Sequence, residues 1–261
     1  MFDMIKANAA FMDGKYMEAF DAYTQGAVVY HDPLAAFNLA FMYFQGYHSP
    51  VNYVWARRYF HRALGLETGE AHFNLALMHM RGQGGNISMA DAFSLMKQSA
   101  ASGCVHAQIY LGVAYTLGCL YDPVEISCLS RIPFPRVIKQ EVSCMLIPGK
   151  GNDPTLEDQR YEIISADEHD AIEMFTMAAA QEDDTYIEEQ IGSAKYMLGQ
   201  AMIEGFGAVY DPQQGYQMMR EAALTYGAKD AIHFLMTHKD TARVYGVDTS
   251  RIAYLSDGKH T

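Results

Sequence analysis

Small and apolar residues recur along this chain in a pattern that is repeated four times. In each copy an Ala is followed by Leu four residues later, by Ala or Gly at the fifth position and by Gly at the eleventh. The first two copies read AAFNLAFMYFQG and AHFNLALMHMRG and begin thirty-six residues apart. Because residues four apart share one face of a helix, the spacing predicts an amphipathic helix in each copy. The copies span residues 35–46, 71–82, 107–118 and 194–205.

A second amphipathic segment follows each copy, so the repeating unit is a helix, a turn and a helix. The small residue at the fifth position predicts a close approach between the two helices, and the Gly at the eleventh predicts a left-handed helix end. Such units bury their apolar faces by stacking on their neighbours. The second segments are YVWARRYFHRALGLETG, MADAFSLMKQSAASG, EHDAIEMFTMAAAQ and PQQGYQMMREAALTYG.

This repeat resembles the Sel1-like repeat family, which is related to the tetratricopeptide repeat. The Tyr eight residues after the first Ala of the Sel1 motif is present at Tyr43 and Tyr115 and is replaced by His79 and Met202. The residues that carry the resemblance most closely are Leu111, Gly112, Tyr115 and Gly118 in one copy, and Ala194, Leu198, Gly199 and Gly205 in another.

The resemblance implies an all-α fold, a right-handed superhelical solenoid of antiparallel helix pairs. Residues 1–33 resemble a tetratricopeptide helix pair, with Gly14, Tyr16, Ala19, Tyr23 and Pro33 at that motif's usual positions. The predicted segments are this pair at 1–33, two Sel1-like repeats and the first helix of a third at 34–118, an insertion at 119–166, the rest of the third repeat with the fourth at 167–230, and a capping helix and tail at 231–261.

The insertion separates the two helices of the third repeat. It is rich in Val, Ile, Pro and Gly, and Pro133 and Pro135 exclude a continuous helix around them. Residues 124–129 and 136–146 could be the strands of a β-hairpin, which would need support from the solenoid or a partner. A shorter insertion, QEDDTYIEEQIGS, precedes the fourth repeat.

Charge argues against two classes of partner. The formal net charge is −12, which disfavours a nucleic-acid partner and docking on an anionic membrane. Residues 153–189 hold thirteen acidic residues and one Arg. This acidic zone is either a solvated surface or a surface for a basic partner.

The start of the chain and the cysteines bear on its compartment. The N-terminal residues show no signal peptide, and no apolar stretch is long enough to span a membrane. Reduced thiols are then the default for Cys104, Cys119, Cys128 and Cys144. We therefore expect a cytoplasmic protein.

The sequence offers no constellation for catalysis. The cysteine spacings do not fit a zinc site, and neither a phosphate-binding loop nor a nucleophile motif is present. We therefore expect a protein that is not an enzyme and that has no cofactor and no metal. An active site, if one existed, would be expected in the insertion.

Binding is expected on the concave face, which the first helices of such a solenoid line. By resemblance to tetratricopeptide proteins, Asn38 and Asn74 occupy the position that often holds the backbone of an extended peptide. An Asn amide both donates and accepts, so it suits this role. The alternative is that both Asn residues bond only to neighbouring helices. The candidate groove residues are Phe37, Asn38, Phe41, Phe73, Asn74, Leu77 and Tyr110.

Two kinds of function follow from these expectations. The first is a non-catalytic scaffold that binds a peptide or helical segment of another protein in the concave groove. Since Arg57, Arg58, His61 and Arg62 are expected on an outer face, the groove should take a largely apolar segment rather than an acidic tail. The second is a peptide-sensing regulator, or an effector or inhibitor, that contacts its target through the insertion at 119–166.

Overall fold

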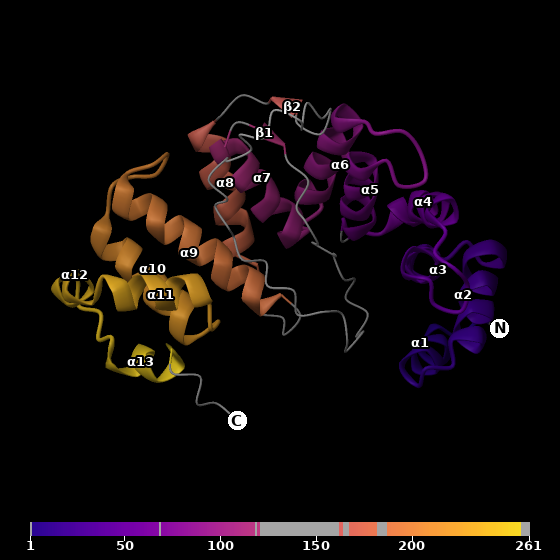
Figure 1. Cartoon of the computed structure of the whole chain (residues 1–261), viewed down its shortest axis with the longest axis horizontal. Helices are drawn as coiled ribbons and strands as arrows, with labels where there is room; N and C mark the ends of the chain where they lie inside the picture. The colour runs from indigo at the N-terminus through magenta and orange to yellow at the C-terminus, as the bar shows by residue number, and fades with distance from the viewer. Residues whose placement is uncertain are drawn as a thin grey trace. The chain divides into compact units, whose positions relative to one another are not determined.

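Two compact units of packed helix pairs make up the described part of the chain, in a computed structural model of the protein (Figure 1). Helices α1 to α6 belong to the first unit and α7 to α13 to the second. No helix among the described residues is long and apolar enough to cross a membrane. The structure describes residues 2–67, 69–117, 119–120, 162–163, 167–181 and 187–256.

The first unit is a succession of three helix pairs. Each helix lies against the next one along the chain, and a short 3-10 turn, Ala63–Gly65, follows α4. The helices are α1 (Met4–Met12), α2 (Tyr16–Val29), α3 (Pro33–Gln45), α4 (Tyr53–Arg62), α5 (Glu70–Arg81) and α6 (Met89–Ala101).

The second unit continues the same scheme and ends in three shorter helices. The pairs α7–α8 and α9–α10 correspond to the third and fourth predicted repeats, and α11 begins close to the predicted capping position at Ala231. The helices are α7 (Val105–Leu117), α8 (Glu168–Ala179), α9 (Glu188–Glu204), α10 (Pro212–Leu224), α11 (Lys229–Thr237), α12 (Lys239–Val244) and α13 (Ser250–Ser256).

The repeated residues occupy the positions that their spacing predicts. The motif leucines Leu39, Leu75, Leu111 and Leu198 are all buried. A Cβ added at Gly199 would lie 2.9 Å from the Gly215 carbonyl, so these two glycines bring the backbones of α9 and α10 together. A Cβ at Gly112 would lie 2.5 Å from the ring of Phe175 on α8. The small residues therefore set the helix-to-helix distance, as predicted.

The predicted left-handed helix ends are confirmed wherever the structure describes them. Gly46, Gly82 and Gly205 have φ values of 78°, 64° and 75° and end α3, α5 and α9. Glycine adopts this region without the steric cost that a Cβ imposes. Gly118 lies outside the described residues.

One backbone hydrogen bond recurs in all four Sel1-like pairs. The first residue before each second helix donates its N–H to the carbonyl of the eighth residue after the motif Ala. These bonds are Asn52 to Tyr43 at 2.9 Å, Ser88 to His79 at 3.1 Å, Asp167 to Tyr115 at 3.2 Å and Asp211 to Met202 at 3.0 Å. Since the bond uses a main-chain carbonyl, the side chain at this position can be Tyr, His or Met without losing it.

The same four donors also cap their helices. Their side-chain oxygens accept hydrogen bonds from backbone N–H groups in the first turn, which no intrahelical carbonyl can reach. Each turn is therefore fixed from both sides, by the N-cap residue's own N–H and by its side chain.

The insertion leaves this arrangement intact in the third pair. Seventeen residues separate Ala71 from Ser88, whereas sixty separate Ala107 from Asp167, yet Asp167 makes the same bond. The ends of the insertion meet in a two-stranded sheet of β1 (Cys119–Leu120) and β2 (Glu162–Ile163). The predicted hairpin strands at 124–129 and 136–146 lie outside the described residues.

Two parts of the C-terminal region differ from the sequence prediction. The shorter insertion before the fourth repeat is partly helical, because α9 begins at Glu188 and is 17 residues long, against 13 for α3. Helices α12 and α13 were not predicted. Their short apolar stretches include Ala242 and Ile252, which are buried in a cluster with Leu235 of α11.

Candidate functional site

Most of the predicted groove residues lie in the core rather than on an open face. Phe37 packs edge-on against Phe60 with ring centroids 5.3 Å apart, and it shares one buried cluster with Phe41. Tyr110 belongs to the second unit. Six of the seven residues are less than about one-tenth exposed, namely Phe37, Asn38, Phe41, Phe73, Leu77 and Tyr110, whereas Asn74 is half-buried.

Asn38 is covered by the N-terminal helix α1. Its side chain has no exposed area, and its Nδ2 donates to Asn8 Oδ1 at 3.3 Å and approaches Met4 Sδ at 3.8 Å. The Tyr23 hydroxyl donates to the same Asn8 oxygen at 2.8 Å. Asn38 therefore links α3 to α1, which corresponds to the alternative of bonding to a neighbouring helix.

The Tyr23 hydroxyl completes this small polar cluster inside an apolar core. Burial raises the pKa of Tyr23 above its ordinary value, so the hydroxyl remains a protonated donor. Asn38 Oδ1 is also buried and accepts no hydrogen bond in the described part of the chain. The sequence offered no signal for Asn8, because its partner is thirty residues away.

Asn74 occupies the equivalent position of the next repeat but has a different environment. Its Nδ2 donates to the Glu70 carbonyl one turn earlier in α5 at 2.8 Å. Its side chain retains part of its exposed area. Of the two Asn residues, Asn74 is thus the one that an external segment could reach without moving a helix.

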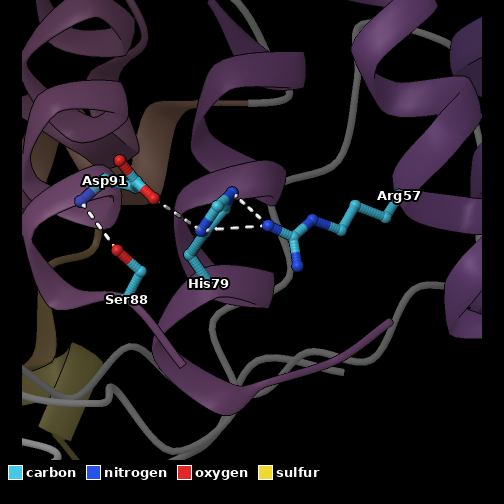
Figure 2. Close-up of polar contacts among 4 residues, drawn as sticks. All are labelled: Arg57, His79, Ser88 and Asp91. Carbon is cyan, nitrogen blue, oxygen red and sulfur yellow. Dashed lines mark hydrogen bonds and ion pairs between the residues drawn. The ribbon is translucent and has the colours of Figure 1, made fainter. Parts of the chain in front are cut away.

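A second polar cluster joins α4, α5 and α6 of the first unit (Figure 2). Nη2 of Arg57 lies 2.7 Å from His79 Nε2 and 3.1 Å from Nδ1, so the guanidinium donates to the imidazole. His79 Nδ1 lies 3.7 Å from Asp91 Oδ2, and the Asp91 N–H donates to Ser88 Oγ at 3.3 Å. A Cβ at Gly85 would collide with the Arg57 guanidinium, so this glycine leaves room for it.

This environment favours the neutral form of His79. Burial lowers the pKa of His79, the Arg57 guanidinium lowers it further, and Asp91 acts in the opposite direction. A neutral imidazole can accept from Arg57, whereas an imidazolium would repel it. The cluster therefore acts as a structural link between three helices.

The described residues contain no group of three or more His, Cys, Asp and Glu side chains arranged to hold a metal ion. Cys104 is a buried thiol of the first unit and forms no disulfide with another described residue. Cys128 and Cys144 lie outside the described residues, and only the backbone of Cys119 is described.

Comparison with known proteins agrees with the repeat pattern. The Sel1 repeat family matches residues 33–64, 69–104, 161–183 and 192–224. No match is found among curated proteins.

Solved structures with a similar fold include a Sel1 repeat protein from Oxalobacter formigenes. That protein is 18% identical with a TM-score of 0.67, and the alignment covers 97% of this chain and 82% of the other. A protective antigen of uropathogenic Escherichia coli strains with an SLR fold aligns at 17% identity and a TM-score of 0.46, over 98% of this chain and 56% of the other. The four matched repeats and the stacked helix pairs with their glycine-ended first helices show that the chain is a Sel1-like repeat protein.

Proposed function

We propose that this chain is a non-catalytic scaffold that binds a peptide or helical segment of another protein along the face of its first helices. Sel1 repeats generally mediate protein–protein interaction. The observation that carries the finer proposal is the half-buried amide of Asn74 on α5, at the peptide-holding position of the motif.

The surroundings of Asn74 suit a binding role. The residues that follow it on α5, Leu75 and Ala76, are fully buried and anchor the helix in the core. A rigid support reduces the entropy lost when a partner binds. An Asn amide both donates and accepts, so the partly exposed side chain of Asn74 has the chemistry to pair with a peptide backbone. Asn38 is proposed to participate only if α1 moves away from α3.

The test of the groove is capture of partner proteins from the source cells by the purified chain and by Asn74→Ala. We expect Asn74→Ala to retain less of a specific partner than the wild type. Asn86→Ala is the matched control, because Asn86 is an exposed Asn in the loop of the same repeat. Equal capture by all three proteins, with unchanged circular dichroism, would contradict the groove proposal.

A second candidate function is contact with a target through the insertion at 119–166. The observation that favours it is the bond from Asp167 to Tyr115, which closes the third pair as in the other repeats although the chain between them is longer. The extra residues are thus not needed for this pairing and are available for another role. A regulator, effector or inhibitor could use them.

Deleting residues 121–163 separates the two candidates. This deletion restores seventeen residues between Ala107 and Asp167, the spacing of the other repeats. If the insertion makes the contact, the shortened chain keeps its helical content and loses its partner. If the groove makes the contact, the shortened chain keeps both, and Asn74→Ala loses the partner.

A further inference from the structure

Helix α4 presents an exposed stripe that combines apolar and cationic side chains. Its inner face is buried through Ala56, Tyr59 and Phe60. The outer residues follow one another at helical spacing on the other side, with Val54 and Trp55 64% and 39% exposed. The α4 stripe is defined as these exposed residues together with Val51, which lies just before the helix: Val51, Val54, Trp55, Arg58, His61 and Arg62.

Aromatic contacts hold the stripe in place. The Trp55 ring is stacked on Tyr43 and on Tyr59, at centroid distances of 6.2 and 5.9 Å. The guanidinium of Arg58 lies 5.0 Å from the Trp55 ring, and that of Arg62 lies 5.3 Å from the Tyr59 ring. These contacts limit the freedom of long side chains before any partner arrives, which reduces the entropy lost on binding.

Within the described residues, the arginines of the stripe are not paired with acidic side chains. Helix α4 contains no Asp or Glu, and in the described part of the chain no carboxylate forms an ion pair with Arg58 or Arg62. The chain as a whole carries a net charge of −12. A cationic stripe on an acidic protein attracts anionic groups, whereas the remaining surface repels them. The charge of the stripe is therefore complementary to that of an acidic partner.

The geometry of the stripe specifies the class of partner. Arg58 and Arg62 are one helical turn apart, about 6 Å, which matches two carboxylates spaced one turn apart on a partner helix. An arginine fork binds carboxylate through paired N–H donors. The exposed valines and Trp55 lie towards the N-terminal end and offer an apolar contact beside the charges. Aromatic and arginine side chains are also the residues that dominate binding energy at protein interfaces.

We propose that the α4 stripe is a second protein-binding surface, which takes an acidic segment of another protein with an apolar anchor next to its carboxylates. This surface lies on a second helix and goes beyond the groove proposed on the first helices. Its residues are distinct from Asn74 and from the residues of the insertion at 119–166.

The test uses the intact chain and a set of fluorescein-labelled helical peptides of about four turns. Each peptide has a Leu anchor and a pair of Glu residues one turn apart, with the distance between anchor and pair varied across the set. A twin set carries Lys in place of Glu. Binding is measured by fluorescence anisotropy and, without the label, by the emission of Trp55, the single Trp of the chain.

We expect at least one Glu peptide to bind, to shift the Trp55 emission and to weaken as salt rises. Arg58→Glu/Arg62→Glu should weaken that binding about tenfold or more. Trp55→Ala should also weaken it. The matched control is Arg220→Glu/Arg251→Glu, which reverses two exposed arginines on α10 and α13 and should leave the affinity unchanged.

Three outcomes overturn the proposal. One is that no Glu peptide binds more tightly than its Lys twin. Another is that Arg58→Glu/Arg62→Glu, with its helical content intact, binds as well as the wild type. The third is that phosphatidylserine vesicles or a single-stranded DNA oligonucleotide bind through the same arginines while no Glu peptide does. Because Asn74→Ala is expected to bind the peptide normally, failure here is distinct from failure of the groove.

Discussion

Two asparagines at one motif position show how the environment of a single residue decides its role. Asn38 is fully buried and bonded to Asn8 of another helix, whereas Asn74 is half-buried and bonded within α5. The local sequence does not distinguish them, because both occur in the same tetrapeptide, FNLA.

We expect Asn38→Ala to reduce the free energy of unfolding by about 1–3 kcal/mol, because it removes a buried hydrogen bond and leaves a void beside Asn8. Asn74→Ala should reduce the free energy of unfolding by less, because this side chain is partly exposed and water can replace part of the hydrogen bonding that is lost. Urea unfolding followed by circular dichroism measures both. Equal losses for the two variants would contradict the difference in burial.

The Arg57–His79 contact makes a pH dependence of stability testable. The pKa of His79 is lowered in the folded state, so the unfolded chain binds more protons between the folded and the unfolded pKa. The contribution of His79 to stability is therefore fully present at pH values above its unfolded-state pKa, near 6.5. It is lost as the pH falls through the folded-state pKa. The pKa values of His61 and His72 are lowered as well and act in the same direction.

We therefore expect the melting temperature to fall between about pH 7 and about pH 5, and His79→Gln to reduce the slope of that fall without abolishing it. Differential scanning calorimetry across this range measures the slope. His233→Gln, which changes an exposed histidine of α11, serves as the control and should retain the wild-type slope. A His79→Gln slope as steep as the wild type's would show that this imidazole is not the titrating group.

At the scale of elements, the close contact between the paired helices α9 and α10 depends on glycines, which have no side chain. A Cβ at Gly215 of α10 would lie 2.6 Å from the Gly199 carbonyl of α9, and this neighbour is backbone that cannot rotate away. The helix propensity of Ala alone would favour the substitution by about 1 kcal/mol. Packing and propensity thus make opposite predictions for this position.

We expect packing to decide, so Gly215→Ala should lower the free energy of unfolding by about 1 kcal/mol or more. Gly65→Ala is the control, because its Cβ would lie an ordinary 3.9 Å from Pro33 Cβ. Chemical denaturation of both variants compares them directly. A more stable Gly215→Ala protein would mean that α9 and α10 separate at little cost.

The recurring bond at the turn also belongs to this scale. It joins the N-cap of each second helix to a carbonyl of the first, and the third pair forms it across the insertion. Two helices that match in length and apolar face can therefore pair even when the connection between them is long, since the entropy of closing a loop grows only slowly with its length.

At the scale of the whole molecule, stability should be local. Each pair of a repeat protein contacts mainly its neighbours along the chain, so a substitution is felt most strongly nearby. The two compact units, α1 to α6 and α7 to α13, are the largest such regions here.

We expect Gly215→Ala to speed amide hydrogen exchange in α9, α10 and α11 while leaving α1 to α3 close to the wild type. Hydrogen exchange read by mass spectrometry of peptic fragments resolves these regions. An equal increase across both units would instead show that the described chain unfolds as one cooperative body.

The repeat pattern alone was sufficient to predict the helix pairs of the four repeats, although not the C-terminal helices α12 and α13. The positions of Leu39, Gly46 and their equivalents predict paired helices, their buried faces and their left-handed ends, and the structure has all three. These features are predictable because they depend on the periodicity and backbone freedom of residues close together in the sequence.

The candidate sites depend on contacts that only the folded chain makes. Periodicity indicates that a face is covered but not which helix covers it, so the burial of Asn38 by α1 could not be read from its motif. The same holds for Arg57 against His79 and for the aromatic rings that hold Arg58 and Arg62. Local spacing therefore specified the helices and their pairing, whereas packing between residues distant in the sequence decided which side chains remain available to a partner.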